Sequence, residues 1–333
     1  MKKPFVSNPK LEFIQTPFEW SGNPVDKDGR FINLHKPFIP KFSEVFKWKT
    51  NPNPFEEAKK QDNWTPKLIK DTSPLKNDRD VLVWLGHASF FLQLQGKKFL
   101  FDPVFGDINF LLKRRVAFPW NPDALKQIDY CLLSHDHRDH LDTTSLKTFA
   151  QNNPNAAYLT GLGIKSTLEG ITGSKDVTEA GWFQRYATVD DIKVYYLPSR
   201  HWGRRWLTDT NKRLWGAFVI EAGGKRIYFG GDSGYDQHFS EARELFGGFD
   251  ICILGVGAFR PEWFMYTSHM SPTDGIQAFH DLNGKVFVPM HHGTFDLSDE
   301  PAGEPYRTLV EAEKTGKING ALFAPGVGEP YYF

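Results

Sequence analysis

His135-Asp136-His137-Arg138-Asp139-His140 directly follows the apolar run 128–133. This H-x-H-x-D-H pattern places four metal-binding side chains within six residues. Side chains two apart in an extended segment point the same way, so His135 and His137 can hold one ion together. Asp139 and His140 come after the chain begins to bend, so they can face a second ion. Imidazole with a minority of carboxylate favours zinc, with iron or manganese as alternatives.

A histidine-rich surface loop without a ligand is the alternative interpretation of this motif. Only 11 histidines occur among 333 residues, so this spacing is hard to obtain by composition. Loops at strand ends are also where catalytic groups are usually presented. We therefore expect a metal centre directly after the apolar run.

Overall charge and cysteine content limit the partners that we expect. Lysine plus arginine equals aspartate plus glutamate at 40 each, so no net field attracts nucleic acid or an anionic membrane. Cys131 and Cys252 lie in apolar runs, which predicts buried thiols and no disulfide framework. The positively charged start lacks the apolar run of a signal peptide. We expect a cytoplasmic protein that binds no nucleic acid, and the oligomeric state stays open.

Two parts of the chain differ in composition. Residues 1–77 are rich in proline, asparagine, lysine and scattered aromatics, which predicts an arm that packs on a body; disorder is the alternative. In the remainder, strands and helices interleave, which indicates two sheets covered by helices. A helix is expected over 143–150, and Ser271 is the expected cap of another. The predicted strands are 81–85, 90–94, 99–101, 128–133, 192–197, 214–220, 226–229, 251–254 and 286–289.

Three further ligand candidates stand just beyond predicted strands. They are His201, Asp232 and His291, and each follows its strand by a few residues. A lone histidine or aspartate in such a place is more often a turn or capping residue. Together with the H-x-H-x-D-H motif, however, they supply about the number of neutral and anionic ligands that two cations need. We expect one edge of the sheets to gather all seven groups.

Several rare residue combinations point to a known family. They are Asp28-Gly29-Arg30-Phe31, Trp84-Leu85-Gly86-His87-Ala88, Asp102-Pro103, 134–142, His201-Trp202, Leu214-Trp215-Gly216, Gly231-Asp232-Ser233-Gly234-Tyr235, Trp263-Phe264-Met265, His269, and His291 with Gly293-Thr294-Phe295. From about Asp28 onward the chain resembles the metallo-β-lactamase fold hydrolases, and within them the branch of N-acylphosphatidylethanolamine-hydrolysing phospholipase D. The resemblance implies an α/β fold, a four-layer αββα sandwich, with 78–333 as the hydrolase domain and 1–77 as the arm.

The resemblance also implies a dinuclear site that activates a bridging hydroxide. His291 is preferred to His292, because His292 stands where the family has an aromatic residue. One ion would be held by His135, His137 and His201, the other by Asp139, His140 and His291, with Asp232 bridging.

Other residues have expected roles around these ligands. His269 resembles the family's phosphate-contacting histidine and, with Asp139 and Asp232, is a candidate catalytic residue; an ordinary loop histidine is the alternative. Asp102 is expected to fix a ligand imidazole from behind, and His87 to be structural or to support the ligands in the same way. The expected substrate mouth comprises Arg138, Trp202 and Trp263. Arg138 replaces a family aromatic, and suits anionic substrates unless it only forms a surface salt bridge.

Three activities follow from the resemblance. The first is a phosphodiesterase of the phospholipase D type that acts on N-acylphosphatidylethanolamine or a related phosphodiester, with possible peripheral membrane contact. The second is a lactonase or other carboxylic ester hydrolase, as in the ascorbate-6-phosphate lactonase-like group. A nuclease is the third, and the balanced charge argues against it. The substrate would be a small molecule or a phospholipid.

Overall fold

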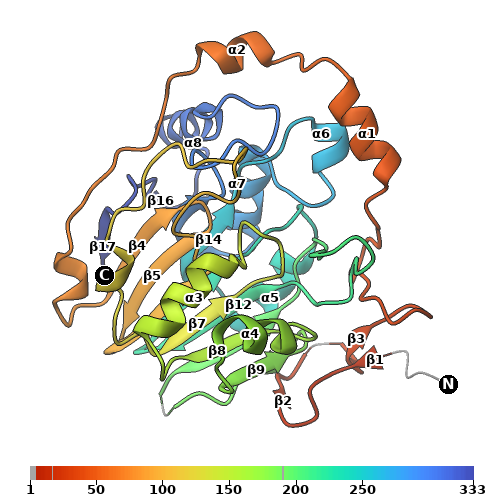
Figure 1. Ribbon diagram of the computed structural model, residues 1–333, viewed down its shortest axis with the longest axis vertical. Coiled ribbons are helices and arrows are strands. Elements are labelled where there is room, and N and C mark those ends of the chain that lie inside the picture. Colours follow the sequence, from red (N-terminus) through yellow and green to blue (C-terminus); the bar gives the residue numbers. More distant parts are fainter. Residues whose placement is uncertain (1–4, 17, 190) are drawn as a thin grey trace.

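Two β-sheets stacked face to face, with helices on their outer faces, form the body of the protein in the computed structural model (Figure 1). The structure describes residues 5–16, 18–189 and 191–333. The layers are those of an αββα sandwich, so the predicted fold class is confirmed. Within the described residues, no helix is long and apolar enough to cross a membrane.

The first sheet has seven strands and contains the strand that leads into the H-x-H-x-D-H motif. Its strands pair antiparallel from β17 to β6 and parallel from β6 to β9. Helices α3 (Thr143–Asn152) and α4 (Lys165–Thr172) lie beside each other on its outer face. The strand order is β17 (Pro330–Tyr332), β4 (Val81–Gly86), β5 (Ser89–Leu94), β6 (Lys97–Phe101), β7 (Tyr130–Leu133), β8 (Ala157–Gly161) and β9 (Val177–Ala180).

The second sheet has eight strands and is parallel from β13 to β16. Helices α7 (Pro272–Asp281) and α8 (Glu304–Lys314) contact its parallel part, and α5 (His238–Phe246) packs beside α7. The strand order is β16 (Ala321–Leu322), β15 (Gly284–Met290), β14 (Phe249–Gly255), β13 (Lys225–Phe229), β12 (Ala217–Ala222), β11 (Lys193–Leu197), β10 (Gln184–Arg185) and β2 (Glu12–Phe13).

The residues of strand β4 are apolar throughout, and the packing of the strand explains this. Successive side chains point to opposite faces of a strand, and both faces of this one are covered. Leu82 and Trp84 enter the core between the sheets, whereas Val81 and Val83 enter the core under α3 and α4. An apolar run without polar alternation is therefore the sequence signature of a sheet buried on both sides.

Local capping and one strand boundary test the sequence predictions closely. The Asp142 side chain accepts from the Ser145 amide at the start of α3, and Ser271 forms a reciprocal capping box at α7, so both predicted starts are confirmed. The strand predicted over 214–220 instead begins at Ala217. The Gly216 amide donates to the Ser134 carbonyl, so the backbone just before β12 bonds to the motif loop and not to the sheet ladder.

The arm runs along the outside of the body (Figure 1). It contains β1 (Phe5–Val6), β2, β3 (Asn23–Pro24), α1 (Phe42–Thr50), α2 (Glu56–Gln61) and a short 3-10 turn, Ser73–Leu75; the body adds a second such turn, Pro122–Ala124, and α6 (Glu262–Met265). The arm is tied to the body by the pairing of β2 with β10 and by side chains, since Trp48 Nε1 donates to Asp299 at 2.9 Å and Arg307 pairs with Asp62 at 2.9 Å. The domain boundary at residue 77 stays a prediction.

Candidate metal centre

The candidate ligands meet at one edge of the two sheets because of the strand directions. Strands β11, β13 and β15 run the same way, so the residues that follow them emerge at one edge. These followers include His201, Asp232 and His291, and the motif loop after β7 meets them from the other sheet. The structure thus brings together all seven groups that the sequence places beyond strand ends.

The first group of side chains comprises His135, His137, His201 and Asp232. His137 Nδ1 lies 2.9 Å from His135 Nε2 and 3.1 Å from His201 Nε2. Burial lowers the pKa of His137 to about 4 and that of His201 to about 3, so these imidazoles are neutral near pH 7. Neutral imidazole nitrogens that converge in this way suit a divalent cation between them.

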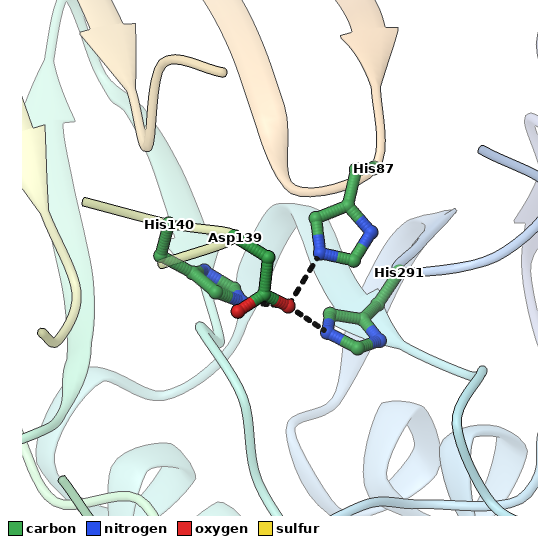
Figure 2. A group of neighbouring side chains, drawn as sticks. All are labelled: His87, Asp139, His140 and His291. Carbon is green, nitrogen blue, oxygen red and sulfur yellow. Dashed lines mark hydrogen bonds and ion pairs between the residues drawn. The ribbon is translucent and has the colours of Figure 1, made fainter. Parts of the chain in front are cut away.

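The second group comprises His87, Asp139, His140 and His291 (Figure 2). Asp139 Oδ2 lies 3.0 Å from His87 Nε2, 3.5 Å from His291 Nε2 and 3.7 Å from His140 Nε2. Although burial lowers the pKa of His291, the facing Asp232 and Asp139 carboxylates raise it to about 9. Near pH 7 His291 therefore carries a proton that faces the two carboxylates, and a bound cation would supply the same positive charge.

Asp232 lies between the two groups. Its Oδ2 atom is 3.2 Å from His140 Nε2, 3.1 Å from His291 Nε2 and 3.7 Å from His201 Nε2. Burial raises the pKa of Asp232, but His140 and His291 outweigh this and hold it well below its usual range. One ionised carboxylate thus faces both halves of the site.

Two contacts orient imidazoles from behind, and a third holds Asp102 in place. Asp102 Oδ2 lies 2.7 Å from His140 Nδ1, and it also accepts from the Ser134 hydroxyl at 2.5 Å. His201 Nδ1 lies 2.9 Å from the Ser268 carbonyl, so this nitrogen is the donor. These contacts leave Nε2 of His140 and His201 as the acceptors that face the site.

The residues present fit bound cations. Among the described residues, His137 Nε2 and Asp232 Oδ1 are buried and make no hydrogen bond. A buried polar atom without a partner costs about 1–3 kcal/mol, and ions would satisfy both. Non-glycine residues with positive φ also cluster here, at His87 (54°) and Asp102 (37°), and such strain is characteristic of functional sites. The donor set of imidazoles and two carboxylates suits zinc.

A cavity of about 760 Å³ opens onto this centre. It reaches His137, Asp139, Asp232 and His291, and its walls combine apolar side chains with charged and polar ones. The arm supplies one wall. The arm residues are Pro37, Phe38, Ile39, Pro40, Lys41, Glu44, Val45 and Trp48, and the apolar residues opposite include Trp202, Trp263, Phe264, Met265 and Leu297.

The remaining predicted residues lie as follows. Arg138, Trp202 and Trp263 line the cavity, and so does His269, whose Nδ1 is 3.9 Å from Asp232 Oδ2. His87, expected only to support the ligands, lies within the second group itself.

His292 points away from the ligands and stacks between two tryptophans. Its ring centroid is 5.1 Å from that of Trp84 and 6.0 Å from that of Trp64. The chain leaves β15 after Met290, and His291 has a φ of 63°, so the backbone turns here and the two side chains leave it in different directions.

The sequence interpretation missed two parts of the cavity. It gave no role to Arg204 and Arg205, although both stand just after His201-Trp202-Gly203 and that closeness was a usable signal. It also did not predict that the arm forms a cavity wall. The arm residues that line the cavity, within 37–48, carry no motif, so their position depends on tertiary contacts alone.

The chain is similar to a family profile, to proteins of related sequence and to solved structures. The sequence profile described as the β-lactamase superfamily domain matches residues 97–292. "N-acyl-phosphatidylethanolamine-hydrolyzing phospholipase D 1" of Caenorhabditis elegans is 34% identical over 227 residues, which are 64% of this chain and 64% of that protein. The match therefore spans just under two thirds of the relative's length.

A second relative is matched over most of its length. A "UPF0173 metal-dependent hydrolase" of Caldivirga maquilingensis is 30% identical over 235 residues, which are 69% of this chain and 89% of that protein. Among solved structures, an isothiocyanate hydrolase from Delia radicum gut bacteria superposes with a TM-score of 0.62 at 20% identity, covering 76% of this chain and 99% of that one. At this identity the structural likeness establishes the fold alone.

Proposed function

The chain belongs to the β-lactamase superfamily, and on that premise we propose that it is a metal-dependent phosphodiesterase of the phospholipase D type. The family assignment confirms the resemblance noted in the sequence. The proposed substrate is N-acylphosphatidylethanolamine or a related phosphodiester. N-acylphosphatidylethanolamine is the lipid in the name of the Caenorhabditis elegans relative. The observation that carries the proposal is a single Asp232 oxygen that faces two groups of imidazoles in a cavity lined by both apolar and charged side chains.

The donor set supports two divalent ions, zinc first. His135, His137 and His201 would hold one, and Asp139, His140 and His291 the other, with Asp232 between them. When bound, two such cations lower the pKa of a water molecule and offset negative charge on the oxygens of a phosphodiester. His87 is an additional candidate ligand or support, because it lies 3.0 Å from Asp139.

Residues of the chain itself would position the substrate. His269 lines the cavity, and its ring centroid lies 5.2 Å from that of His201, so it can donate a hydrogen bond to a non-bridging phosphoryl oxygen. The aromatic walls formed by Trp202 and Phe264 suit acyl chains and exclude water from the reacting group. Hydrogen bonds behind His140 and His201 hold the ligand rings still during the reaction.

The test combines metal analysis with a substrate panel. Protein purified without added metal is analysed for zinc, iron and manganese, and then assayed with bis(p-nitrophenyl) phosphate, N-acylphosphatidylethanolamine and a simple lactone. The proposal expects about two ions per chain and cleavage of both phosphodiesters, with Asp232→Asn as the inactive control. Cleavage of the lactone alone would refute the phosphodiesterase and favour the carboxylic ester hydrolase, while less than one ion per chain would refute the dinuclear site.

A further inference from the structure

Four arginines lie around the metal centre, and they divide into two pairs by their contacts. Arg138 belongs to the motif loop, whereas Arg204, Arg205 and Arg213 belong to the loop that follows His201. Arg205 and Arg213 are largely buried, and Arg138 and Arg204 are exposed. The two pairs therefore require separate explanations.

The two buried arginines, Arg205 and Arg213, form the inner pair, and their guanidinium groups make structural contacts. Arg205 donates to the Leu141 carbonyl at 2.8 Å and to the Thr143 hydroxyl at 2.7 Å. Arg213 pairs with Asp136 at 2.9 Å, and this buried pair ties the loop after His201 to the motif loop. These guanidinium contacts hold the two loops together.

The two exposed arginines, Arg138 and Arg204, form the outer pair, and their guanidinium groups lack contacts of this kind in the described residues. Over residues 5–16, 18–189 and 191–333, neither Arg138 nor Arg204 has a carboxylate within ion-pair distance or a hydrogen bond from its guanidinium group. Each stacks on a tryptophan instead: Arg138 lies 5.5 Å from the Trp206 ring centroid and Arg204 lies 5.4 Å from that of Trp202. A stacked guanidinium is held in place and keeps its N–H edges free for an anion.

Both outer arginines line the same cavity as the proposed metal ligands. The Trp202 ring that carries Arg204 packs edge-on against His137, with centroids 4.5 Å apart. Burial, followed by the nearby Arg138, lowers the pKa of Arg205, so positive charges repel one another at this wall. An anion bound there would relieve that repulsion.

We propose that Arg138 and Arg204 form an anion subsite for a second acidic group of the substrate, a carboxylate or phosphate distinct from the group that is cleaved. This inference rests on the proposed function for the position of the reacting phosphodiester. The subsite favours, among phosphodiesters related to N-acylphosphatidylethanolamine, those with a second negative group, since that lipid itself carries only the charge of its phosphodiester. The tryptophans beneath the arginines fix the place of the subsite. It contributes to binding before the chemical step, so it acts on KM more than on kcat.

The test compares two soluble probes that differ by one negative charge. Phenylphosphonate and 4-carboxyphenylphosphonate are titrated calorimetrically into zinc-loaded wild type, Arg138→Gln and Arg204→Gln. Arg243→Gln is the matched control, because Arg243 is exposed on α5 away from the cavity. We expect each cavity variant to reduce the preference for the carboxylated probe about three- to tenfold, as for a partly exposed charge-assisted contact. Binding of phenylphosphonate should stay unchanged.

The outcomes separate this subsite from the proposed activity. A wild type without preference for the carboxylated probe, or variants that weaken both probes equally, would overturn the subsite. If the preference for the carboxylated probe depends on the two arginines but the protein cleaves no phosphodiester, the subsite stands and the proposed function is refuted. Sedimentation with anionic phosphatidylglycerol vesicles adds a third arm: arginine-dependent vesicle binding without the probe preference would assign the pair to a lipid surface and overturn the proposal.

Discussion

Replacing Asp102 with asparagine should weaken metal binding by reversing one imidazole tautomer. The Asp102 side chain is fully buried and accepts from the Ser134 amide at 2.8 Å and from the Ser134 hydroxyl at 2.5 Å. It also lies 2.7 Å from His140 Nδ1, so the carboxylate keeps the proton on that nitrogen. An asparagine amide can place its NH₂ group there instead, which drives the proton to Nε2, the atom that faces the site.

The magnitude follows from comparable contacts behind metal ligands. Loss of such a partner typically costs 10–100-fold in metal affinity, which is about 1.4–2.7 kcal/mol. The assay is zinc dissociation measured by competition with a chromophoric chelator, with thermal unfolding of the metal-free protein beside it. Asp176→Asn is the matched control, because Asp176 is exposed and distant from the cavity.

One result would refute the reasoning. If Asp102→Asn binds both ions within about twofold of wild type while the metal-free protein unfolds at an unchanged temperature, Asp102 does not control the tautomer of His140. A lower unfolding temperature with unchanged zinc affinity would assign Asp102 to folding alone.

The remaining predictions concern the metal bridge, the buried ion pair, the arm and metal removal. Asp232→Asn should lower turnover more than about 100-fold and reduce metal content, with far-ultraviolet circular dichroism unchanged; full activity with normal metal content would exclude the bridging role. Arg213→Ala leaves the buried Asp136 carboxylate unpaired, so urea denaturation should show a loss of about 3 kcal/mol, and a loss below about 1 kcal/mol would contradict this. Trp48→Ala removes the hydrogen bond to Asp299 and the stack on Phe264, so KM should rise for long-chain substrates but not for bis(p-nitrophenyl) phosphate; an equal rise for both would exclude an acyl-contacting wall. Chelation of metal should lower the unfolding temperature, because ions that bind only the folded state stabilise it, and an unchanged temperature would count against a metal centre.

The metal motif and the strands around it could be predicted because their signals are local. An apolar run followed by H-x-H-x-D-H reads as a buried strand that ends at a site, whatever the rest of the chain does. The helix starts at Asp142 and Ser271 could also be predicted, since a cap depends on residues three positions apart. The position of β12 was harder, because Gly216 bonds to Ser134, which lies far away in the sequence.

Other parts of the candidate site could not be predicted because they depend on contacts between distant segments. His87 sits in a turn between β4 and β5, and Asp139 lies in the loop after β7. The order of these strands within the first sheet brings the two side chains to 3.0 Å from each other. The wall around Trp48 likewise depends on Asp299, 251 positions away. Sequence separation of this size leaves no periodicity from which to infer the contact.

The sequence by itself determined the kind of chemistry, since imidazoles and carboxylates at these spacings suit divalent cations in any fold that exposes them together. The apolar runs without alternation also predicted sheets covered on both faces, and the family resemblance implied the four-layer sandwich. Only the tertiary structure decided that Asp232 faces both groups and that the arm forms one wall of the cavity. It also decided that, in the described part of the chain, Arg138 and Arg204 have no carboxylate partner while Arg205 and Arg213 are held by hydrogen bonds and an ion pair. The physical reason is that a metal site or an unpaired charge depends on which atoms lie within a few ångströms of it. The order of residues along the chain does not state the distances between segments that are far apart in the sequence.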